Sequence, residues 1–478
     1  MSTNRLPTQH EDFPGWYNEV VKRAELAEHG PAKGSMIIKP HGYGIWELTQ
    51  RALDDRFKAT GHENLYFPLL IPMSLLQKEA DHVEGFAPQV AVVTHGGGEK
   101  LEEPLAIRPT SEAIIWSTYK RWIQSYRDLP LLYNQWCNVL RWEMRTRLFL
   151  RTSEFLWQEG HTAHATSGEA TEEALRMLEV YREVAEDVLA IPVFSGRKSP
   201  AERFPGAVET YCIEGLMRDA KALQCGTSHF LGQNFAKAYD VTFLNTDGVA
   251  EHAWATSWGF SARMVGGTVM AHGDDAGLRL PPAAAPVQVA IVPIYRTDDE
   301  RSSVLGVAQQ LRADLAAQGI RVRLDDRDQH RPGYKFAEWE LKGVPLRIEL
   351  GPRDVAADRV VIASRLGGDK GEVALGEVVG GMAARLASVQ AELFADALAY
   401  REANTHEITT YESFATGVEE QGGFWVGPWC GEAACETEVS ARTRATIRFL
   451  PIQPNNPGDT CMYCGKPGVD VATWARAY

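Results

Sequence analysis

The run Leu-Pro-Pro-Ala-Ala-Ala-Pro at positions 280–286 divides the chain into two regions with different apolar patterns. After this run, apolar segments of strand length alternate with amphipathic segments of helix length. The expected strands and helices are, in order, Val287–Ile294, Ser303–Gln318, Ile320–Leu324, Tyr334–Leu341 and Leu346–Leu350. This alternation is typical of a small α/β domain with a largely parallel sheet. We expect a long alanine-rich helix, Met382–Ala403, to follow it.

The region before the run mixes helices with antiparallel strands. Residues 42–61 carry apolar side chains at helical spacing and end in a glycine, which commonly caps a helix C-terminus. Val90–Thr94 and Leu105–Ile107 flank a turn with three glycines, which predicts a hairpin. Thr166 and Glu169 have the spacing of a capping box and precede another amphipathic segment.

Composition and charge narrow the class of protein. With 478 residues and 44% hydrophobic side chains, the chain is long enough for two or three packed domains. The first ten residues are polar, and no apolar run reaches the roughly 18–20 residues that span a bilayer, so we expect a cytoplasmic protein without a signal peptide. The net charge of −14 argues against non-specific nucleic-acid binding. Four arginines in one stretch oppose this sign: Arg141, Arg145, Arg147 and Arg151.

These arginines suggest nucleotide binding without a standard phosphate-binding loop. The sequence contains neither Gly-x-x-x-x-Gly-Lys-Ser/Thr nor Gly-x-Gly-x-x-Gly. Instead, Arg141-Trp142-Glu143 is followed by a loop and Arg151, and Arg263 stands just before Gly266-Gly267. An arginine guanidinium holds phosphate oxygens bidentately and keeps its charge. The alternative for each single arginine is a solvated ion pair with a nearby carboxylate.

The last part of the chain contains four of its seven cysteines: Cys430, Cys435, Cys461 and Cys464. The odd total and the late clustering argue against a disulfide framework. Two pairs of thiolates at this spacing satisfy tetrahedral Zn²⁺ with no open position, which predicts a structural zinc site. Such a site would stabilise a domain too small for a sufficient core. Buried free thiols are the alternative.

The motifs, in their order along the chain, resemble those of class II aminoacyl-tRNA synthetases. The helix ending in Phe67-Pro68 is similar to motif 1, the arginine-rich stretch from 141 to 155 to motif 2, and the glycine-flanked Arg263 to motif 3. Three further blocks resemble the prolyl-specific members of that class: 108–112, 157–164 and 225–234. The resemblance extends over nearly the whole chain.

The resemblance implies three domains and a homodimer. Residues 1–282 would form an antiparallel-sheet class II catalytic domain, residues 283–400 an α/β anticodon-binding domain, and residues 401–478 a small zinc-bearing α/β domain. The stretch from Phe155 to Trp258 is too short for the editing domain that many bacterial prolyl enzymes insert there. The chain therefore resembles the archaeal/eukaryote-like branch, and we expect it not to deacylate mischarged alanyl-tRNA.

The implied activity is that of a proline–tRNA ligase. L-Proline and ATP, with Mg²⁺, would form prolyl-adenylate and pyrophosphate, and the prolyl group would then pass to the 3′ end of tRNA(Pro). The resemblance gives Arg141 and Arg263 the catalytic role of stabilising phosphate charge. The residues implied for ATP are Arg141, Glu143, Arg151, Phe155, Gln224, Thr227 and Arg263. Those implied for proline are Thr110, Glu112, Arg141, Trp157, Glu159, His161 and His229, with Phe204 as a weaker candidate.

Two other roles follow from the resemblance. Glu340, Arg347 and Asp354 are candidates to read anticodon bases, because single-stranded bases expose edges that carboxylates and arginines recognise. Each of them is equally credible as a member of a surface ion pair. The C-terminal carboxylate on Tyr478 is a candidate to approach the active site.

Two functions of other classes remain open on the sequence. The anticodon-like region alone is compatible with a non-catalytic tRNA-binding protein. His161-x-x-His164 beside Glu159 is compatible with a metal-dependent hydrolase, although no further ligand stands at a suitable spacing. The arginine motifs argue against the first function, and packed, hydrogen-bonded histidines are the simpler reading of the second pattern.

Overall fold

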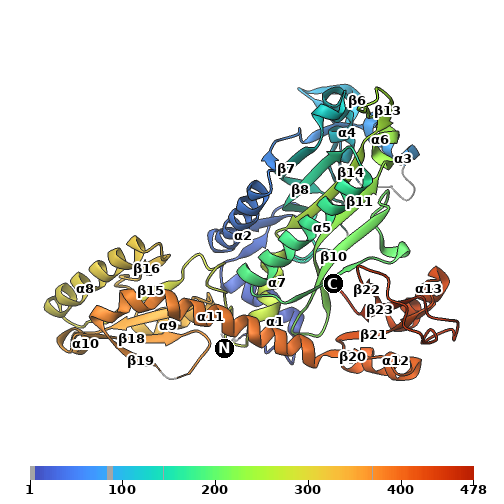
Figure 1. Ribbon diagram of the computed structural model, residues 1–478. Helices are drawn as coiled ribbons and strands as arrows, with labels where there is room; N and C mark the ends of the chain where they lie inside the picture. Colours follow the sequence, from blue (N-terminus) through green and yellow to red (C-terminus); the bar gives the residue numbers. More distant parts are fainter. Residues whose placement is uncertain (1–5, 83–89, 144, 369) are drawn as a thin grey trace.

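The computed structural model describes residues 6–82, 90–143, 145–368 and 370–478. They form a central body that rises from an elongated base (Figure 1). The second region of the chain lies at one end of this base and the cysteine-bearing third region at the other. None of the described helices is both long enough and apolar enough to cross a membrane.

A seven-stranded sheet forms the central body, with the strand order β3-β7-β8-β14-β11-β10-β9. β3 pairs with β7 in parallel, and all other pairs are antiparallel. In sheet order, the strands are β3 (Glu63–Asn64), β7 (Leu131–Leu140), β8 (Glu154–His164), β14 (Trp254–Ser261), β11 (Ala222–Gly232), β10 (Glu209–Leu216) and β9 (Val193–Arg197).

Helices cover one face of this sheet and enclose the largest hydrophobic core. These helices are α1 (Phe13–Arg23), α2 (Pro40–Ala59), α5 (Ser167–Glu183), which continues into a π-helical turn at Val184–Val188, and α7 (Arg263–His272). Trp258 of β14 is almost fully buried beneath them, and its indole packs directly over Gly160 of β8. A Cβ at position 160 would lie 2.1 Å from that ring, so only glycine fits there.

Several local predictions for this region are confirmed. The predicted helix 42–61 is α2, and the Thr166–Glu169 capping box begins α5. The predicted hairpin is β5 (Val92–Gly96) with β6 (Glu99–Ile107), which also pairs with β4 (Leu70–Pro72). The remaining elements are β1 (Ala27–His29), β2 (Met36–Ile38), α3 (Met73–His82), α4 (Glu112–Trp122), the 3₁₀ turns Tyr126–Asp128 and Pro200–Glu202, α6 (Asn234–Tyr239), β12 (Thr242–Leu244) and β13 (Ala250–His252).

The second region contains a five-stranded sheet of order β16-β15-β17-β18-β19, with its helices packed against it. The elements are β15 (Val289–Pro293), α8 (Asp298–Ala317), β16 (Val322–Leu324), α9 (Pro332–Leu341), β17 (Leu346–Leu350), α10 (Pro352–Ala356), β18 (Arg359–Ser364), β19 (Gly371–Ala374) and α11 (Leu375–Ala403). The helix α8 begins earlier than predicted because Thr297 and Glu300 form a capping box.

The prediction of a largely parallel sheet is wrong for one half of this sheet. β15 pairs in parallel with β16 and β17, but β17 with β18 and β18 with β19 are antiparallel. The connection from β17 to β18, residues 351–358, is shorter than the dozen or so residues that a parallel crossover needs. The chain therefore turns back on itself, and the domain remains α/β, as predicted.

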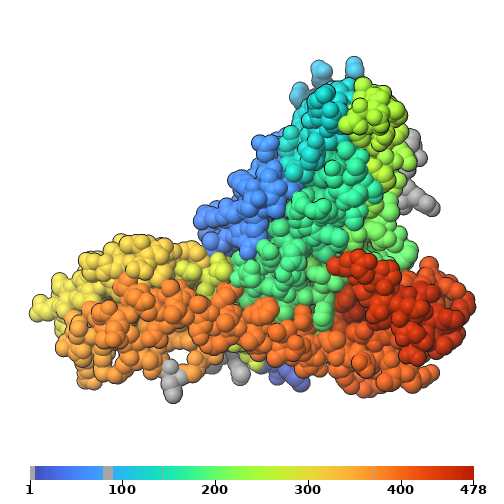
Figure 2. All heavy atoms as spheres, in the orientation of Figure 1, coloured from blue at the N-terminus to red at the C-terminus, as the bar shows by residue number. Residues whose placement is uncertain are grey.

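The long helix α11 runs along the base and links the second region to the third (Figure 1). The third region has a four-stranded sheet of order β20-β21-β23-β22. Its elements are β20 (Thr405–Glu407), α12 (Tyr411–Glu420), β21 (Phe424–Trp429), α13 (Ala433–Thr443), β22 (Thr446–Phe449) and β23 (Asp470–Ala475). This region packs directly against the lower part of the central body (Figure 2). The predicted combination of one antiparallel and two smaller α/β units is confirmed.

Candidate active site and metal site

A cavity of about 670 Å³ lies on the face of the seven-stranded sheet that the helices leave open. Alternate residues of a strand point to opposite faces. On β8, Trp157, Glu159 and His161 accordingly line the cavity, while Gln158 hydrogen-bonds to Tyr181 of α5 on the other face. The two-residue period of one strand thus delivers three of the predicted site residues to one surface.

A β-bulge brings two further predicted residues to the same surface. β10 and β11 change register between Ile213 and Glu214, because Cys225 is an extra residue on β11. Gln224 and Thr227 are three positions apart and would point to opposite faces of a regular strand. The extra residue brings both to the same face, where they line the cavity. His229 lies two residues farther along β11 and is also part of the wall.

A buried carboxylate, Glu159, is the centre of the polar network at one end of the cavity. Its oxygens accept hydrogen bonds from Ser111, from Gln135 Nε2 at 2.9 Å and from Cys137 Sγ at 3.3 Å. His161 Nε2 lies 3.1 Å from its other oxygen. Burial acts to raise the pKa of Glu159, but the hydrogen bonds and the positive charge of His161 outweigh burial and lower it. Glu159 is therefore ionised.

His161 is the partner of Glu159 in this pair. Burial acts to lower its pKa, but the hydrogen bond to Glu159 and the nearby charges of Glu112 and Glu159 outweigh burial and raise it. Its Nδ1 is buried and has no hydrogen-bond partner among the described residues. The same is true of Ser257 Oγ, on the residue opposite His161 in the neighbouring strand β14. Two paired residues of neighbouring strands that line the cavity thus each have a polar atom without a partner among the described residues.

Glu112 is a second buried carboxylate, at the start of α4. Thr110 donates a hydrogen bond to it. Ser111 occupies the N-cap position of α4, yet its hydroxyl makes no capping bond and donates to Glu159 instead. The segment 110–112 therefore gives up a helix cap, which typically contributes about 1 kcal/mol, to organise the cavity.

His229 and Phe204 close this end of the cavity. Burial lowers the pKa of His229 to about 3, so its imidazole is neutral at physiological pH. Its Nδ1 lies 3.0 Å from Thr210 Oγ1, and the Phe204 ring lies 4.7 Å from the imidazole, measured between centroids. An apolar wall of this kind fits a small aliphatic ring better than a charged side chain.

Arginines line the rest of the cavity. The Arg141 Cζ atom lies 5.4 Å from the Phe155 ring centre and 5.6 Å from that of Trp157. Arg263 Nε donates to the Leu150 carbonyl at 3.1 Å. Neither Arg141 nor Arg263 forms an ion pair with any carboxylate in the described part of the chain. The solvated-ion-pair alternative therefore does not hold for these two, and their charge is available to an anion.

Arg151 differs from the other two. Its Nε donates to Glu143 Oε2 at 2.7 Å, and its side chain is largely exposed. Both partners nevertheless line the cavity. An ion pair this exposed contributes little stability, so the pair opens readily when a more highly charged ligand enters.

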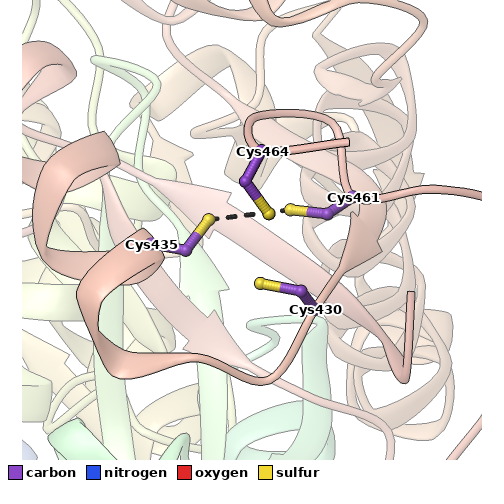
Figure 3. Close-up of side chains that lie close together, drawn as sticks. All are labelled: Cys430, Cys435, Cys461 and Cys464. Carbon is purple, nitrogen blue, oxygen red and sulfur yellow. Dashed lines mark hydrogen bonds between the residues drawn. The ribbon is translucent and has the colours of Figure 1, made fainter. Parts of the chain in front are cut away.

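The four clustered cysteines lie on two loops and the first turn of α13. Their sulfur atoms lie within 4.8 Å of one another, and the side chains point toward a common centre (Figure 3). Cys435 Sγ and Cys461 Sγ are 3.6 Å apart. Four thiolates around Zn²⁺ at about 2.3 Å would have sulfur–sulfur distances of about 3.8 Å, so this cluster fits the ion. Burial acts to raise the pKa of Cys461, but backbone hydrogen bonds outweigh burial and lower it to about 7.

Comparison with known proteins then decides the family. The family model "tRNA synthetase class II core domain (G, H, P, S and T)" matches residues 95–271, and "Anticodon binding domain" matches 288–385. "Prolyl-tRNA synthetase, C-terminal" matches 411–478. Proline–tRNA ligases from Amoebophilus asiaticus and Flavobacterium johnsoniae are 51% and 52% identical to this chain, over 99% and 100% of both chains, respectively. A third, from Prosthecochloris aestuarii, is 52% identical over 99% of both. The chain belongs to the proline–tRNA ligase family.

For this family member, the structure gathers every residue predicted for ATP and proline around one cavity. Sequence reasoning did not single out the residues that hold Glu159, although Ser111 stands inside a predicted motif. Gln135 and Cys137 carry a weaker signal, because they alternate along β7 opposite Glu159 and Trp157. Lys198 and Arg203 were also missed; both line the cavity from an irregular segment without a motif.

Other predicted residues are placed apart from the cavity or from each other. His164 lies on the opposite face of β8 from His161, because three positions separate them, so the two do not form a ligand pair. In the second region, Glu340 and Arg347 line a second, small cavity with Arg365, whereas Asp354 accepts a hydrogen bond from the Gly351 amide at 2.9 Å as part of a helix cap.

Two further predictions concern the stretch from Phe155 to Trp258 and the C-terminal residue Tyr478. Residues 155–258 fold into strands of the central sheet, the elements packed on them and the small β12–β13 hairpin, without a separate inserted domain. The Tyr478 ring lies 5.6 Å from Arg147 Cζ of the motif 2 loop, and its hydroxyl donates to Asp219 at 2.6 Å. The end of the chain thus contacts the loop between Arg141 and Arg151.

Proposed function

We propose that this protein is a proline–tRNA ligase that activates L-proline with ATP and transfers it to tRNA(Pro). One observation carries the proposal: two arginines that form no ion pair with a described carboxylate and a network of buried carboxylates line the same cavity. The first suits the phosphates of ATP and the second suits the cationic amine of an amino acid.

In the first step, the proline carboxylate attacks the α-phosphate of ATP, which is bound as its Mg²⁺ complex, and pyrophosphate leaves. Arg141 lies between the two ends and stabilises the charge that develops on the α-phosphate. Arg263 and Arg151 hold the β- and γ-phosphates, and Glu143, released by Arg151, orients the adenine. Phe155 stacks on the base, while Gln224 and Thr227 contact the nucleotide from β11. No protein nucleophile is required.

At the other end of the cavity, Thr110 and Glu112 accept the hydrogens of the secondary ammonium. Glu159 and His161, whose mutual hydrogen bond favours the charged form of each, lie beside it. Trp157, His229 and Phe204 enclose the pyrrolidine ring. A pocket of this size rejects larger side chains by overlap but distinguishes proline from alanine only through lost apolar contact, which amounts to about 1–3 kcal/mol per methylene.

The transfer step requires tRNA recognition and stable domains. We propose that Glu340 and Arg347 read anticodon bases, with Asp354 as a weaker member of the set. We propose that Cys430, Cys435, Cys461 and Cys464 hold a structural Zn²⁺ ion that takes no part in catalysis. The units 1–282, 283–400 and 401–478 are supported by the family matches, each of which falls inside one of them. The cytoplasm, where tRNA is charged, is the proposed location.

We also propose that two copies associate through the upper end of the central body. Exposed apolar side chains gather there, including Tyr66, Trp122 and Leu244, with exposed fractions of 68%, 45% and 49%. Trp122 lies against Phe67, and Leu244 pairs with Ser125. Apolar clusters of this kind mark interaction surfaces. Sedimentation of the purified protein at micromolar concentration should give twice the mass of one chain.

Amino-acid-dependent ATP–pyrophosphate exchange across the twenty amino acids tests the central proposal. Proline is expected to give the only strong signal. A stronger signal from another amino acid would contradict the assignment of proline, and the absence of exchange with all twenty would favour a non-catalytic tRNA-binding protein. Incubation with alanyl-tRNA(Pro) is expected to release no alanine faster than the uncatalysed rate, since no editing domain is inserted.

A further inference from the structure

The cavity has one wall that is attached to the cysteine-bearing third region of the chain. This wall is formed by residues 198–206, here called the wall segment, which make up most of the connection from β9 to β10. Lys198, Glu202, Arg203, Phe204 and Pro205 of this segment line the cavity. The segment contains only a single 3₁₀ turn, so groups outside it must fix its course.

The beginning of the wall segment is held by groups of the third region and by Glu214 of β10. Ser199 Oγ donates a hydrogen bond of 2.7 Å to Glu436 Oε1, and both residues are buried. Lys198 Nζ donates to Glu214 Oε1 and to the Arg448 carbonyl, each at 2.8 Å. Arg448 Nη2 also donates to Glu214, at 2.9 Å. A buried ion-pair network is strongly destabilised when one partner is lost, so these contacts fix the segment firmly.

The end of the wall segment is attached to the amino-acid end of the cavity. The Phe204 amide donates to Thr210 Oγ1 at 3.0 Å, and this oxygen also lies 3.0 Å from His229 Nδ1. The Phe204 ring packs on the His229 imidazole. His229, Ser257 and His161 are neighbours in one row across β11, β14 and β8. The segment therefore extends from the third region to the place where the proline ring is proposed to bind.

Glu436 connects this wall to the cysteine cluster. It follows Cys435 directly in the first turn of α13, so the position of its backbone depends on the cluster. Its second oxygen, Oε2, is buried without a hydrogen-bond partner among the described residues. A buried carboxylate with an unused oxygen is unfavourable for folding. Among the described residues, the bond from Ser199 is the only side-chain hydrogen bond of Glu436, so it is the contact through which Glu436 acts on the wall segment.

We infer that Glu436 and Ser199 are positioning residues, through which the cysteine-bearing region holds the wall segment and Phe204 against the amino-acid end of the cavity. The inference rests on the proposed function, because it assigns a part of the proline affinity to a contact outside the cavity. Neither Arg141 nor Arg263 hydrogen-bonds to Ser199 or Glu436. Their side chains donate to the Pro109 and Leu150 carbonyls instead. Loss of the contact is therefore expected to weaken proline binding and to leave ATP binding intact.

The test measures proline-dependent ATP–pyrophosphate exchange for the unaltered protein and three variants. Glu436→Ala is expected to raise the KM for proline about fivefold, as for the loss of one hydrogen bond, with kcat and the KM for ATP unchanged within about twofold. Glu436→Gln, whose amide oxygen still accepts from Ser199, is expected to restore the KM for proline. Glu438→Ala is the matched control, because Glu438 is an exposed residue of the same helix.

Zinc content and melting temperature are measured for every variant. They are expected to equal those of the unaltered protein, which separates an effect on the wall from loss of the metal site. An unchanged KM for proline in Glu436→Ala, or a parallel rise of both KM values, would overturn the inference. If Glu436→Ala does not fold, Ser199→Ala removes the same hydrogen bond from the other side and decides by the same criteria. Absence of proline-dependent exchange in the unaltered protein would instead contradict the proposed function.

Discussion

The cavity of the central sheet and the four-cysteine cluster both hold ionisable side chains close together, but by different means. Around the cavity, Glu159 and His161 stand on a strand whose register is fixed on both sides and whose other face is packed against helices. Cys461 and Cys464 stand on a loop between β22 and β23, and three of the four cysteines are themselves part of the apolar cluster of the third region. A large core can support buried charges through hydrogen bonds alone, whereas in a small region the proposed zinc ion would supply part of the stability.

Metal removal is expected to have the largest effect and to separate the two regions. Cys435→Ser, or treatment with a chelator, should unfold the third region locally, because structural zinc contributes on the order of 10 kcal/mol in small domains. Hydrogen exchange should become fast in β21, β22 and α13, while β7 and β8 keep their protection. Cys212→Ser, outside the cluster, should retain zinc and protection. Equally fast exchange in β7 and β8 would show that the two regions do not differ in this way.

Acid should destabilise the central body before the carboxylates titrate. Burial lowers the pKa of His164 and His272 to about 4 and that of His229 to about 3. In the unfolded chain these groups bind protons near pH 6.5, so the unfolded state gains protons that the folded state does not. Stability should therefore decrease as the pH falls below 6.5, with a slope that approaches about 1.4 kcal/mol per pH unit for each histidine at lower pH.

Urea unfolding at pH 6.5, 6.0 and 5.5 measures this decrease. His161 contributes with the opposite sign, because its pKa is raised in the folded state: it partly offsets the decrease near pH 6.5, and less so as the unfolded chain becomes protonated. His95→Gln, which replaces an exposed histidine of β5, should leave the slope unchanged. A constant unfolding free energy over this range would show that the buried histidines are protonated at little cost, and that the core of the central body does not restrain them.

The substitution Arg141→Ala is expected to change the free energy of unfolding very little but to lower the rate of proline activation strongly. The variant lacks a charge that stabilises the transition state, which typically lowers kcat by about 10²- to 10³-fold. Since Arg141 forms no ion pair with a described carboxylate, the melting temperature should hardly change. Arg145→Ala is the matched control, because Arg145 is exposed and does not line the cavity. A loss of less than tenfold in pyrophosphate exchange would remove Arg141 from the proposed catalytic role.

Local elements were predictable where the signal lies within a few residues. The capping box of α5 and the hairpin β5–β6 are confirmed. The helix α8 begins earlier than predicted, because Thr297 and Glu300 form a capping box before the apolar pattern starts. The prediction of a parallel sheet is wrong from β18 onward, because the direction of strand pairing depends on the length of the connection, which apolar periodicity does not show. Among the anticodon candidates, Glu340 and Arg347 share a cavity and Asp354 caps a helix, a distinction that composition and spacing do not contain.

By itself, the sequence determined the family, the arginine motifs and the two closely spaced pairs of cysteines, because each depends on residue types at short, ordered spacings. The tertiary structure decided which groups share an environment. It placed His161 and His164 on opposite faces of one strand, and it brought Ser111, Gln135 and Cys137 to a single carboxylate. It also joined Ser199 to Glu436, which are 237 positions apart in the chain. Contacts of this kind depend on how sheets and domains pack, and no local pattern encodes them.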